Sequence, residues 1–331
     1  MKKLEIPAIA AILIVQGMMT ISARAAEATS PALSTREAPG RIEILARGQG
    51  IATYVYEDTA INRPYFCQIK TLEGVQVTRV HPPDPVINKG NDDHPLFHPG
   101  LWLAFGDING SDYWRNKARV RHVRFLAPVE AAAEKVRFAV LNRYERADAS
   151  GAPICEEACT YTIQAADAGY FLLARSVFRS DTADFSFGDQ EEMGFGVRLN
   201  TPLTVKFGTG SLVNSAGGRN EKGTWGQAST WCAASGLADG KRVGVAVMPA
   251  PDNFRPAWFH TRDYGLIVAN PFGRKAMTAP EDAQAAPDAT VVRKGEPFTL
   301  AFGVYVFGGG ADAQPDFARA YETCLDLFKA K

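Results

Sequence analysis

The chain of 331 residues alternates apolar and polar positions in many short runs that are separated by turn residues. Because successive side chains of a strand point to opposite faces, a period of two predicts half-buried strands. We predict strands at 41–46, 51–56, 65–69, 75–80, 118–126, 136–144, 158–164, 170–178, 194–199, 228–233, 243–248, 266–269, 291–292 and 298–307. So many short strands predict an all-β fold, a large antiparallel sandwich or barrel.

Only the C-terminus has a clear helical period. Apolar residues follow Pro315 at spacings of three and four, namely Phe317, Ala320, Tyr321, Cys324, Leu325 and Phe328. This stripe predicts an amphipathic helix that packs on the sandwich. We expect one domain over 41–331, formed by the sandwich and this helix.

The N-terminus has the pattern of a secretory signal peptide over residues 1–25. Lys2 and Lys3 precede an apolar run from Ile6 to Val15, and Ala23-Arg24-Ala25 forms a small-x-small cleavage site. The run is short of the roughly 20 apolar residues that span a bilayer. We therefore expect a periplasmic or secreted protein, with residues 26–40 as a flexible linker and no stable membrane insertion after cleavage.

The charge of the chain is balanced, with 36 basic and 36 acidic residues. Removing residues 1–25 takes away three basic residues and one acidic residue, which leaves 33 and 35. No basic run is present, so we expect no nucleic-acid partner. Five cysteines are present; Cys155 and Cys159 are either bridged across a turn or ordinary residues of one strand, and the sequence leaves both readings open. It also leaves the oligomeric state open.

The segment 91–117 is the richest in reactive groups, with two histidines, four aspartates and two tryptophans. Its turn residues predict a looped surface, where binding residues are commonly carried. We take this segment as the centre of the site.

Histidine transfers protons near neutral pH, and a neighbouring carboxylate fixes its tautomer and raises its basicity. His94 follows Asp93 directly, and a second imidazole comes from a distant part of the chain. We predict His94, His260, Glu192 and Asp107 as the acid–base residues. Asp107 is also explained as a turn former, and Glu192 as a solvated strand edge.

A sugar is the natural substrate for such a mixture, because its C–H faces stack on aromatic rings and its hydroxyls take hydrogen bonds from polar side chains. The predicted substrate-binding residues are His98, Trp102, Asn109, Trp114, Arg198, Arg255, Arg262 and Tyr264. A tryptophan in a sandwich is more often a core residue, and Arg198 also fits a core position beside a buried carboxylate.

Several motifs occur together in one order along 41–308. They are Arg63-Pro64-Tyr65-Phe66, Val77-Thr78-Arg79, Asp93-His94-Pro95, His98-Pro99-Gly100-Leu101-Trp102, Gly106-Asp107-Ile108-Asn109-Gly110, Asp112-Tyr113-Trp114, Trp258-Phe259-His260-Thr261-Arg262-Asp263-Tyr264-Gly265 and Asn270-Pro271-Phe272-Gly273. In these the chain resembles the PmoA-like family of exported bacterial proteins, a domain family of unknown function often labelled "methane oxygenase PmoA". The resemblance implies a sandwich like that of galactose mutarotase relatives, in bacteria that degrade complex glycans.

The label itself does not fit the chain. The methane monooxygenase subunit of that name is an integral membrane protein, and this chain, once residues 1–25 are removed, has no apolar stretch long enough to span a bilayer. We therefore reject methane oxidation. The chain also has Leu96-Phe97 where family members often carry a histidine adjacent to His-Pro.

Three hypotheses follow. The first is an exported carbohydrate-active enzyme that uses acid–base chemistry and needs no cofactor, of hydrolase, lyase or epimerase type. The second is a metal-dependent enzyme with a divalent metal on His94, His98 and Asp93; Pro95 and Pro99 argue against the helix that would align the two histidines. The third is a non-catalytic glycan-binding protein.

Overall fold

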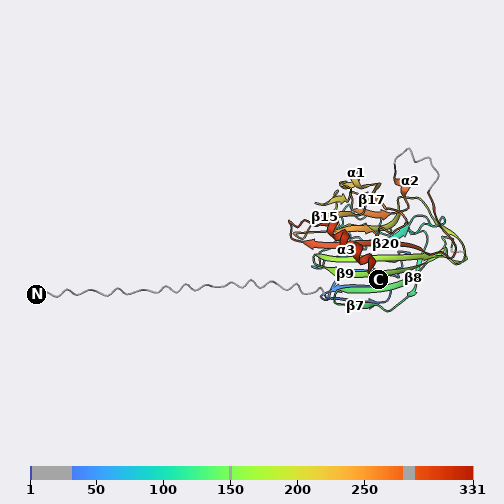
Figure 1. The fold of residues 1–331 in the computed structure, drawn as a ribbon, viewed down its shortest axis with the longest axis horizontal. Coiled ribbons are helices and arrows are strands. Elements are labelled where there is room, and N and C mark those ends of the chain that lie inside the picture. Colours follow the sequence, from blue (N-terminus) through green and yellow to red (C-terminus); the bar gives the residue numbers. More distant parts are fainter. Residues whose placement is uncertain (2–31, 149–150, 279–287, 331) are drawn as a thin grey trace. The chain divides into compact units, whose positions relative to one another are not determined.

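Two large antiparallel sheets pack against each other in the computed structural model, which describes residues 1, 32–148, 151–278 and 288–330 (Figure 1). In sheet 1 the strand order is β1-β2-β3-β4-β5-β12-β18-β17-β14. Its strands are β1 (Leu33–Ala38), β2 (Arg41–Ala46), β3 (Gln49–Val55), β4 (Tyr65–Cys67), β5 (Leu101–Phe105), β12 (Met193–Arg198), β18 (Leu266–Asn270), β17 (Trp258–Arg262) and β14 (Gln227–Ala228).

Sheet 2 has the order β13-β15-β16-β20-β10-β9-β8-β6, and β7 also pairs with β8. Its strands are β13 (Ser211–Asn214), β15 (Cys232–Ala238), β16 (Lys241–Pro249), β20 (Phe298–Gly309), β10 (Gly169–Arg179), β9 (Cys155–Ala166), β8 (Lys135–Tyr144), β6 (Val120–Phe125) and β7 (Glu130–Ala132). A two-stranded ribbon joins β11 (Phe185–Phe187) to β19 (Thr290–Val292). The helical elements are η1 (Thr201–Leu203), α1 (Asn220–Thr224), α2 (Arg274–Met277) and α3 (Phe317–Lys329).

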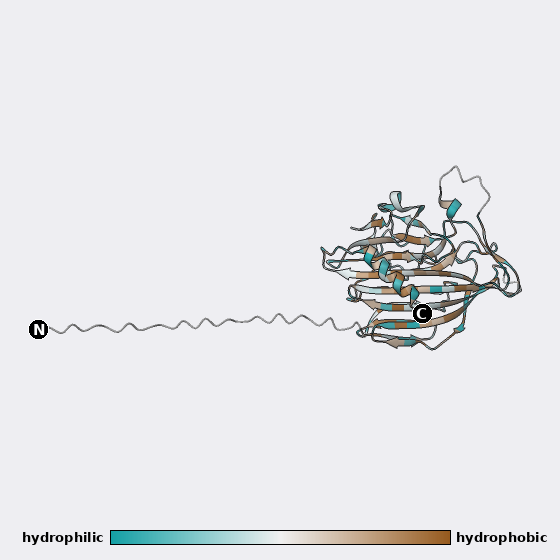
Figure 2. Ribbon diagram, in the orientation of Figure 1, coloured by the Kyte–Doolittle hydropathy of each residue, from teal (hydrophilic) through white to brown (hydrophobic). Residues whose placement is uncertain are grey.

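The predicted antiparallel sandwich with a C-terminal helix is confirmed. Side chains from both sheets form one core, in which Phe195 of β12 stacks on Phe302 of β20 with ring centroids 5.2 Å apart. Helix α3 places Ala320 and Cys324 against the other face of sheet 2, and its polar residues face away. Figure 2 shows the resulting mixture of hydrophilic and hydrophobic residues along the helix.

Sheet 1 has a second face, turned away from this core, which we call the outer face. Alternation assigns side chains to it: on β12, Phe195 and Val197 enter the core, so Arg198 lies on the outer face. By the same argument the outer face carries Trp102 and His260. Loops cover it, and a second apolar cluster forms beneath them.

Three expectations about the strands are corrected. The segment 91–117 is not looped throughout, because it contains β5, which pairs with β4 and β12. Residues 33–38 of the predicted linker form β1, paired with β2 along its whole length. The predicted strand 75–80 makes only isolated bridges, from Gln76 to Lys70 and from Thr78 to Leu199.

The other expectations about the chain have separate outcomes. Cys155 and Cys159 lie four residues apart on β9, which is roughly 13 Å along a strand and too far for a disulfide; both are free. The predicted signal peptide and the linker up to residue 31 lie outside the described residues, apart from Met1. Among the helices that the structure describes, none is both long and apolar enough to cross a membrane.

Candidate functional site

A loop that follows residue 80 folds over the outer face and is held there by Arg79. This side chain is 1% exposed, and its guanidinium donates hydrogen bonds to four backbone carbonyls of the loop. The acceptors are Asn91 (2.8 Å), Asp93 (2.6 Å), His94 (3.4 Å) and His98 (3.0 Å). Arg79 therefore fixes the course of the backbone from 91 to 98.

Arg198 binds the side chains of the same loop from β12. It is fully buried, and it donates from Nε to Asn91 Oδ1 (3.1 Å) and from Nη1 to His98 Nδ1 (3.1 Å). Its Nη2 contacts the Asp93 carboxylate, and its guanidinium lies 4.2 Å from the centre of the Tyr264 ring. Burying a guanidinium is unfavourable unless its donors are satisfied, so this arrangement binds the loop tightly to the sheet.

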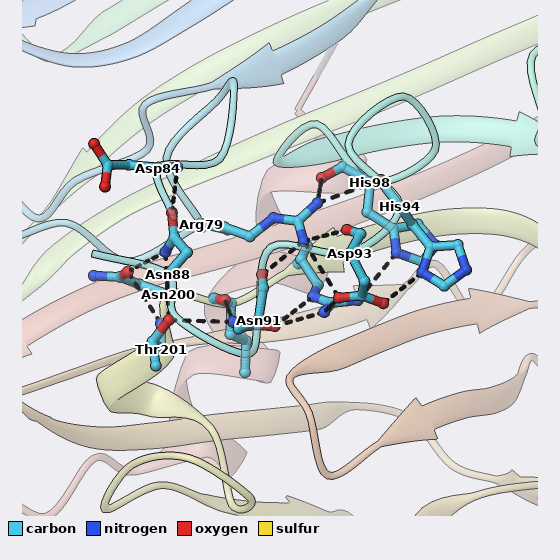
Figure 3. Close-up of polar contacts among 11 residues, drawn as sticks. Arg79, Asp84, Asn88, Asn91, Asp93, His94, His98, Asn200 and Thr201 are labelled. Carbon is cyan, nitrogen blue, oxygen red and sulfur yellow. Dashed lines mark hydrogen bonds and ion pairs between the residues drawn. The ribbon is translucent and has the colours of Figure 1, made fainter. Parts of the chain in front are cut away.

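A further anchor holds the first half of the loop. Asn88 is buried and donates to Asn200 Oδ1 (3.4 Å) and Thr201 Oγ1 (3.3 Å), beside η1. Its own side-chain oxygen accepts from the Asp84 backbone N–H (3.1 Å). Figure 3 shows these contacts together with those of Arg79.

Asp93 and His94 form a pair at the end of this network. One carboxylate oxygen of Asp93 contacts Arg198. The other contacts Nδ1 of His94 (Figure 3). Burial favours the neutral acid, but Arg198 and then His94 outweigh it and hold the pKa of Asp93 below its usual range. The His94 side chain is 51% exposed, and its backbone has φ = +49°, an uncommon conformation for a non-glycine residue.

His98 is buried beneath His94, and its ring stacks on Trp102 at 5.1 Å between centroids and 13° between planes. Trp114 meets the same ring edge-on at 5.8 Å. Burial and then the positive charge of Arg198 lower the pKa of His98 well below its usual value, so the ring is neutral. The predicted substrate-binding residues His98, Trp102, Trp114 and Arg198 are all enclosed, and their side chains support the pair from beneath.

Other predicted residues lie on the same outer face, along β17. His260 is buried and donates from Nδ1 to the Glu191 carbonyl (2.9 Å); burial lowers its pKa to about 4, and Arg262 adds to the effect. Arg262 is ion-paired with Glu191 (3.2 Å), and Glu192 is ion-paired with Arg115. Strand β12 pairs with β18, which pairs with β17, so Arg262 and Arg198 both face Leu266 in register.

Three other predicted residues make local contacts of their own. Asp107 Oδ1 accepts from the Gly110 backbone N–H (2.7 Å), and Asn109 Oδ1 accepts from the Ser186 backbone N–H (2.8 Å), so both are turn formers. Arg255 pairs with Asp288 at 2.8 Å. The catalytic role predicted for Asp107, and the binding roles predicted for Asn109 and Arg255, stay predictions for which these contacts give no support.

The outer face offers poor ligands for a metal. Asp93 and His98 already bind Arg198, and the second guanidinium, that of Arg79, lies beside them. Two buried cations repel a divalent ion, and the neutral His98 ring uses Nδ1 to accept from Arg198. Over the part of the chain that the structure describes, no three or more His, Cys, Asp or Glu side chains are grouped as a metal site.

Two cavities lie beside the sheets, outside the contacts of Arg79 and Arg198. One of about 650 Å³ is on the sheet 2 side, between α3 and strands β10 and β20. One of about 380 Å³ is on the outer face of sheet 1, and Pro95 and Leu96 line it directly after His94. The larger cavity contains none of the predicted site residues, whereas the smaller borders the loop that carries the pair.

Arg79, Asn91 and Arg115 belong to this network and were not predicted from the sequence. Arg79 had a usable signal, since an arginine inside an apolar strand pattern is unlike a surface residue and needs buried partners. Asn91 and Arg115 had none, because their partners are about 100 and 80 residues away in the chain.

Comparison with known proteins gives a family and a set of distant folds. A model described as "Family of unknown function (DUF6807)" matches residues 41–320. A search of curated proteins found no match.

The solved structures that resemble the chain do so at low identity. A galactose mutarotase-like protein from Lactobacillus casei is 11% identical, with a TM-score of 0.36, over 83% of this chain and 99% of that one. A galactose mutarotase related enzyme from Lactobacillus acidophilus is 11% identical, with a TM-score of 0.37, over 86% and 100%. A putative kojibiose phosphorylase from human microbiome is 8% identical, with a TM-score of 0.38, over 91% of this chain and 32% of that one.

Proposed function

Since the chain belongs to the family DUF6807, whose function is unknown, we propose a function from the site alone. The protein is a carbohydrate-active enzyme in which His94, oriented by Asp93, transfers a proton to or from a sugar.

The observation that carries this proposal is the pairing of Asp93 with His94. A carboxylate at Nδ1 fixes the tautomer, so the proton sits on Nδ1 and the Nε2 lone pair is free to accept another. Backbone in the left-handed region costs a non-glycine residue of order 1 kcal/mol or more and persists only where the surroundings enforce it. Here the buried Arg79 and Arg198 enforce it, and half of the imidazole remains exposed.

Partly exposed aromatic rings support a sugar as the substrate. Trp258 shares the outer face with Arg262, and the Arg262 guanidinium lies 5.7 Å from the centre of the Trp225 ring. Tyr264 lies beneath Arg198, next to Asp93. Partly exposed rings beside charged groups bind the C–H faces and hydroxyls of a sugar together.

The type of reaction depends on which carboxylates are free of ion pairs and can act as acid, base or nucleophile. Hydrolysis of a glycoside commonly uses two carboxyl groups, one as acid and one as base or nucleophile. Glu191 and Glu192 are each ion-paired with an arginine, whereas the His94 ring is open to solvent. We therefore favour proton transfer at an anomeric centre or an acidic C–H, as in mutarotation, epimerisation or elimination.

A glycan-binding protein without catalysis is the second candidate. It is favoured by the ion pairs of Glu191 and Glu192 and by the hydrogen bond of His260, because these groups are satisfied within the protein. In that case the imidazole of His94 serves only as a hydrogen-bonding group.

The test measures turnover and binding on one panel of sugars. Polarimetry follows the equilibration of pure anomers, ultraviolet absorbance follows the unsaturated products of elimination, and calorimetry measures sugar binding. The proposal predicts turnover in the wild type and its loss in His94→Asn. Binding of a sugar without turnover by either assay would favour the second candidate.

Two further proposals come from the sequence. We propose that the protein is exported and cleaved after residue 25, and that it is related to the PmoA-like exported proteins whose motifs it resembles. Mass spectrometry of the protein from the periplasm and the medium tests the cleavage site.

A further inference from the structure

The cavity of about 380 Å³ lies on the outer face of sheet 1, over β2, β3 and β4. Residues of these strands line it, and the loop residue Pro95 borders it next to His94. Its volume is near the lower end of the roughly 300–1,000 Å³ of small-molecule sites, which suits a single ring rather than a large ligand.

A fixed carboxylate provides the first polar group of the cavity. The Tyr65 hydroxyl donates to Asp58 Oδ2 (2.6 Å), and the backbone N–H groups of Ala60 and Ile61 donate to Oδ1 (2.6 and 3.0 Å). Burial opposes ionisation of Asp58, but these hydrogen bonds, led by that of Tyr65, hold its pKa below the usual range. Near neutral pH the cavity therefore contains a charged acceptor beside a phenol oxygen that still has lone pairs to offer.

His81 provides a donor beside these acceptors. Its ring meets Tyr65 edge-on at 5.2 Å, and its Nδ1 is buried without a hydrogen-bond partner among the described residues. Burial lowers its pKa to about 4, so the ring is neutral near pH 7. A neutral ring with its proton on Nε2 avoids leaving a buried donor unpaired, and that tautomer presents an N–H group.

The remaining lining determines the class of ligand. Val55, Leu96 and prolines supply apolar surface, and Glu57 and Asp58 outnumber the single cation, Arg41. An excess of negative charge disfavours an acidic ligand. Acceptors and a donor beside apolar surface match the hydroxyls and C–H groups of a neutral sugar ring.

We propose that this cavity binds one neutral sugar ring of a glycan whose neighbouring unit reaches His94. The substrate is then an oligosaccharide or polysaccharide, and not a free monosaccharide. This inference rests on the proposed function for the site of catalysis, although the cavity is formed by different residues.

The test is the dependence of binding on glycan length. Calorimetry measures the affinity for mono-, di-, tri- and tetrasaccharides from cellulose, xylan, mannan and starch. We expect at least one series to bind more tightly as it lengthens. We expect Tyr65→Phe, His81→Gln and Arg41→Ala each to weaken the longer ligands by about tenfold, because each removes or changes a hydrogen-bonding group that lines the cavity. The effect on the monosaccharide is expected to be smaller.

Controls make the result specific to the cavity. Tyr305→Phe is a matched substitution of a partly buried tyrosine on the sheet 2 side and should leave the affinities unchanged. Arg41 is exposed, so Arg41→Ala tests the cavity even if the buried Tyr65 is needed for folding. The inference is overturned if no series gains affinity with length, or if the cavity variants weaken short and long ligands equally.

The same titrations on His94→Asn separate the two proposals. Length-dependent binding that the cavity variants weaken, in a protein whose turnover survives His94→Asn, would support the cavity and reject the catalytic role. Loss of turnover in His94→Asn, together with an affinity that does not depend on glycan length, would support the catalytic role and reject the cavity.

Discussion

The buried guanidinium of Arg198 contacts the carboxylate of Asp93, and this contact joins the sheet to the loop that carries His94. Arg198 is fully enclosed, whereas the Asp93 side chain is 41% exposed. The contact therefore joins a buried side chain of sheet 1 to a partly exposed side chain of the loop. A rigid strand holds a carboxylate, and the carboxylate orients an exposed imidazole.

Replacement of Arg198 tests this connection. In Arg198→Met, Asn91, Asp93 and His98 lose their shared donor. Breaking a buried pair costs about 3 kcal/mol or more, and partial solvation of Asp93 reduces that figure here. We expect a lower free energy of unfolding, measured by chemical denaturation, together with loss of turnover.

Arg293→Met is the matched control, because the Arg293 side chain is 68% exposed in its pair with Asp184. Exposed pairs contribute roughly 0–1 kcal/mol, so little change is expected. Equal destabilisation by the two variants would mean that Arg198 does not anchor the loop.

Acid should weaken the same connection. The folded pKa of Asp93 lies below its ordinary value of about 3.9, so its contribution to stability is present above that value and is lost as the pH falls through the folded pKa. We expect Asp93→Asn to have a lower melting temperature near neutral pH and a shallower decline in acid than the wild type. Parallel declines in the two proteins would show that Asp93 is not held by Arg198.

The lowered pKa of His260 predicts a second pH dependence of stability, which begins at a higher pH than that of Asp93. Its folded pKa of about 4 lies below the ordinary value of about 6.5, so the unfolded chain gains a proton first as the pH falls. Stability is complete above about pH 6.5 and is lost towards pH 4, by at most roughly 3 kcal/mol. In His260→Gln, the amide can still donate to the Glu191 carbonyl. Melting temperatures between about pH 7 and pH 5 should fall less in this variant; an unchanged slope would exclude His260 as a source.

Substitution of Gly196 tests whether the ring of Trp102 is held in place. A Cβ atom at Gly196 would lie 2.8 Å from the Trp102 ring, so Gly196→Ala must displace the indole that supports His98. Such crowding costs typically 1–3 kcal/mol. Denaturation should show this loss, whereas Gly310→Ala, where a Cβ meets no atom within 4 Å and the backbone does not have a positive φ, should lose less. Equal losses would mean that the ring of Trp102 moves freely.

Most of the fold could be predicted because alternation directly reports half-buried strands. Strand β5 was missed for the opposite reason: Leu101–Phe105 is apolar on both sides, since loops cover the outer face and the core covers the inner one. The predicted strand 75–80 alternates because Val75 and Val77 enter the core, but it pairs only at single residues.

The site could be predicted only in part. His94 and Asp93 are adjacent in sequence, so their pairing was accessible to inspection. The burial of Trp102 and Trp114 depends on loops that close over them, and the partners of Arg198 come from residues about 100 positions earlier. No local pattern contains those contacts.

The most direct test of the central claim compares His94→Asn with His122→Asn on a sugar that the wild type turns over. His122 is a partly buried histidine of β6 in sheet 2, outside the site. We predict that His94→Asn lowers kcat/KM by roughly 10²-fold or more with an unchanged melting temperature, and that His122→Asn keeps wild-type turnover. Full turnover by His94→Asn would contradict proton transfer by this imidazole.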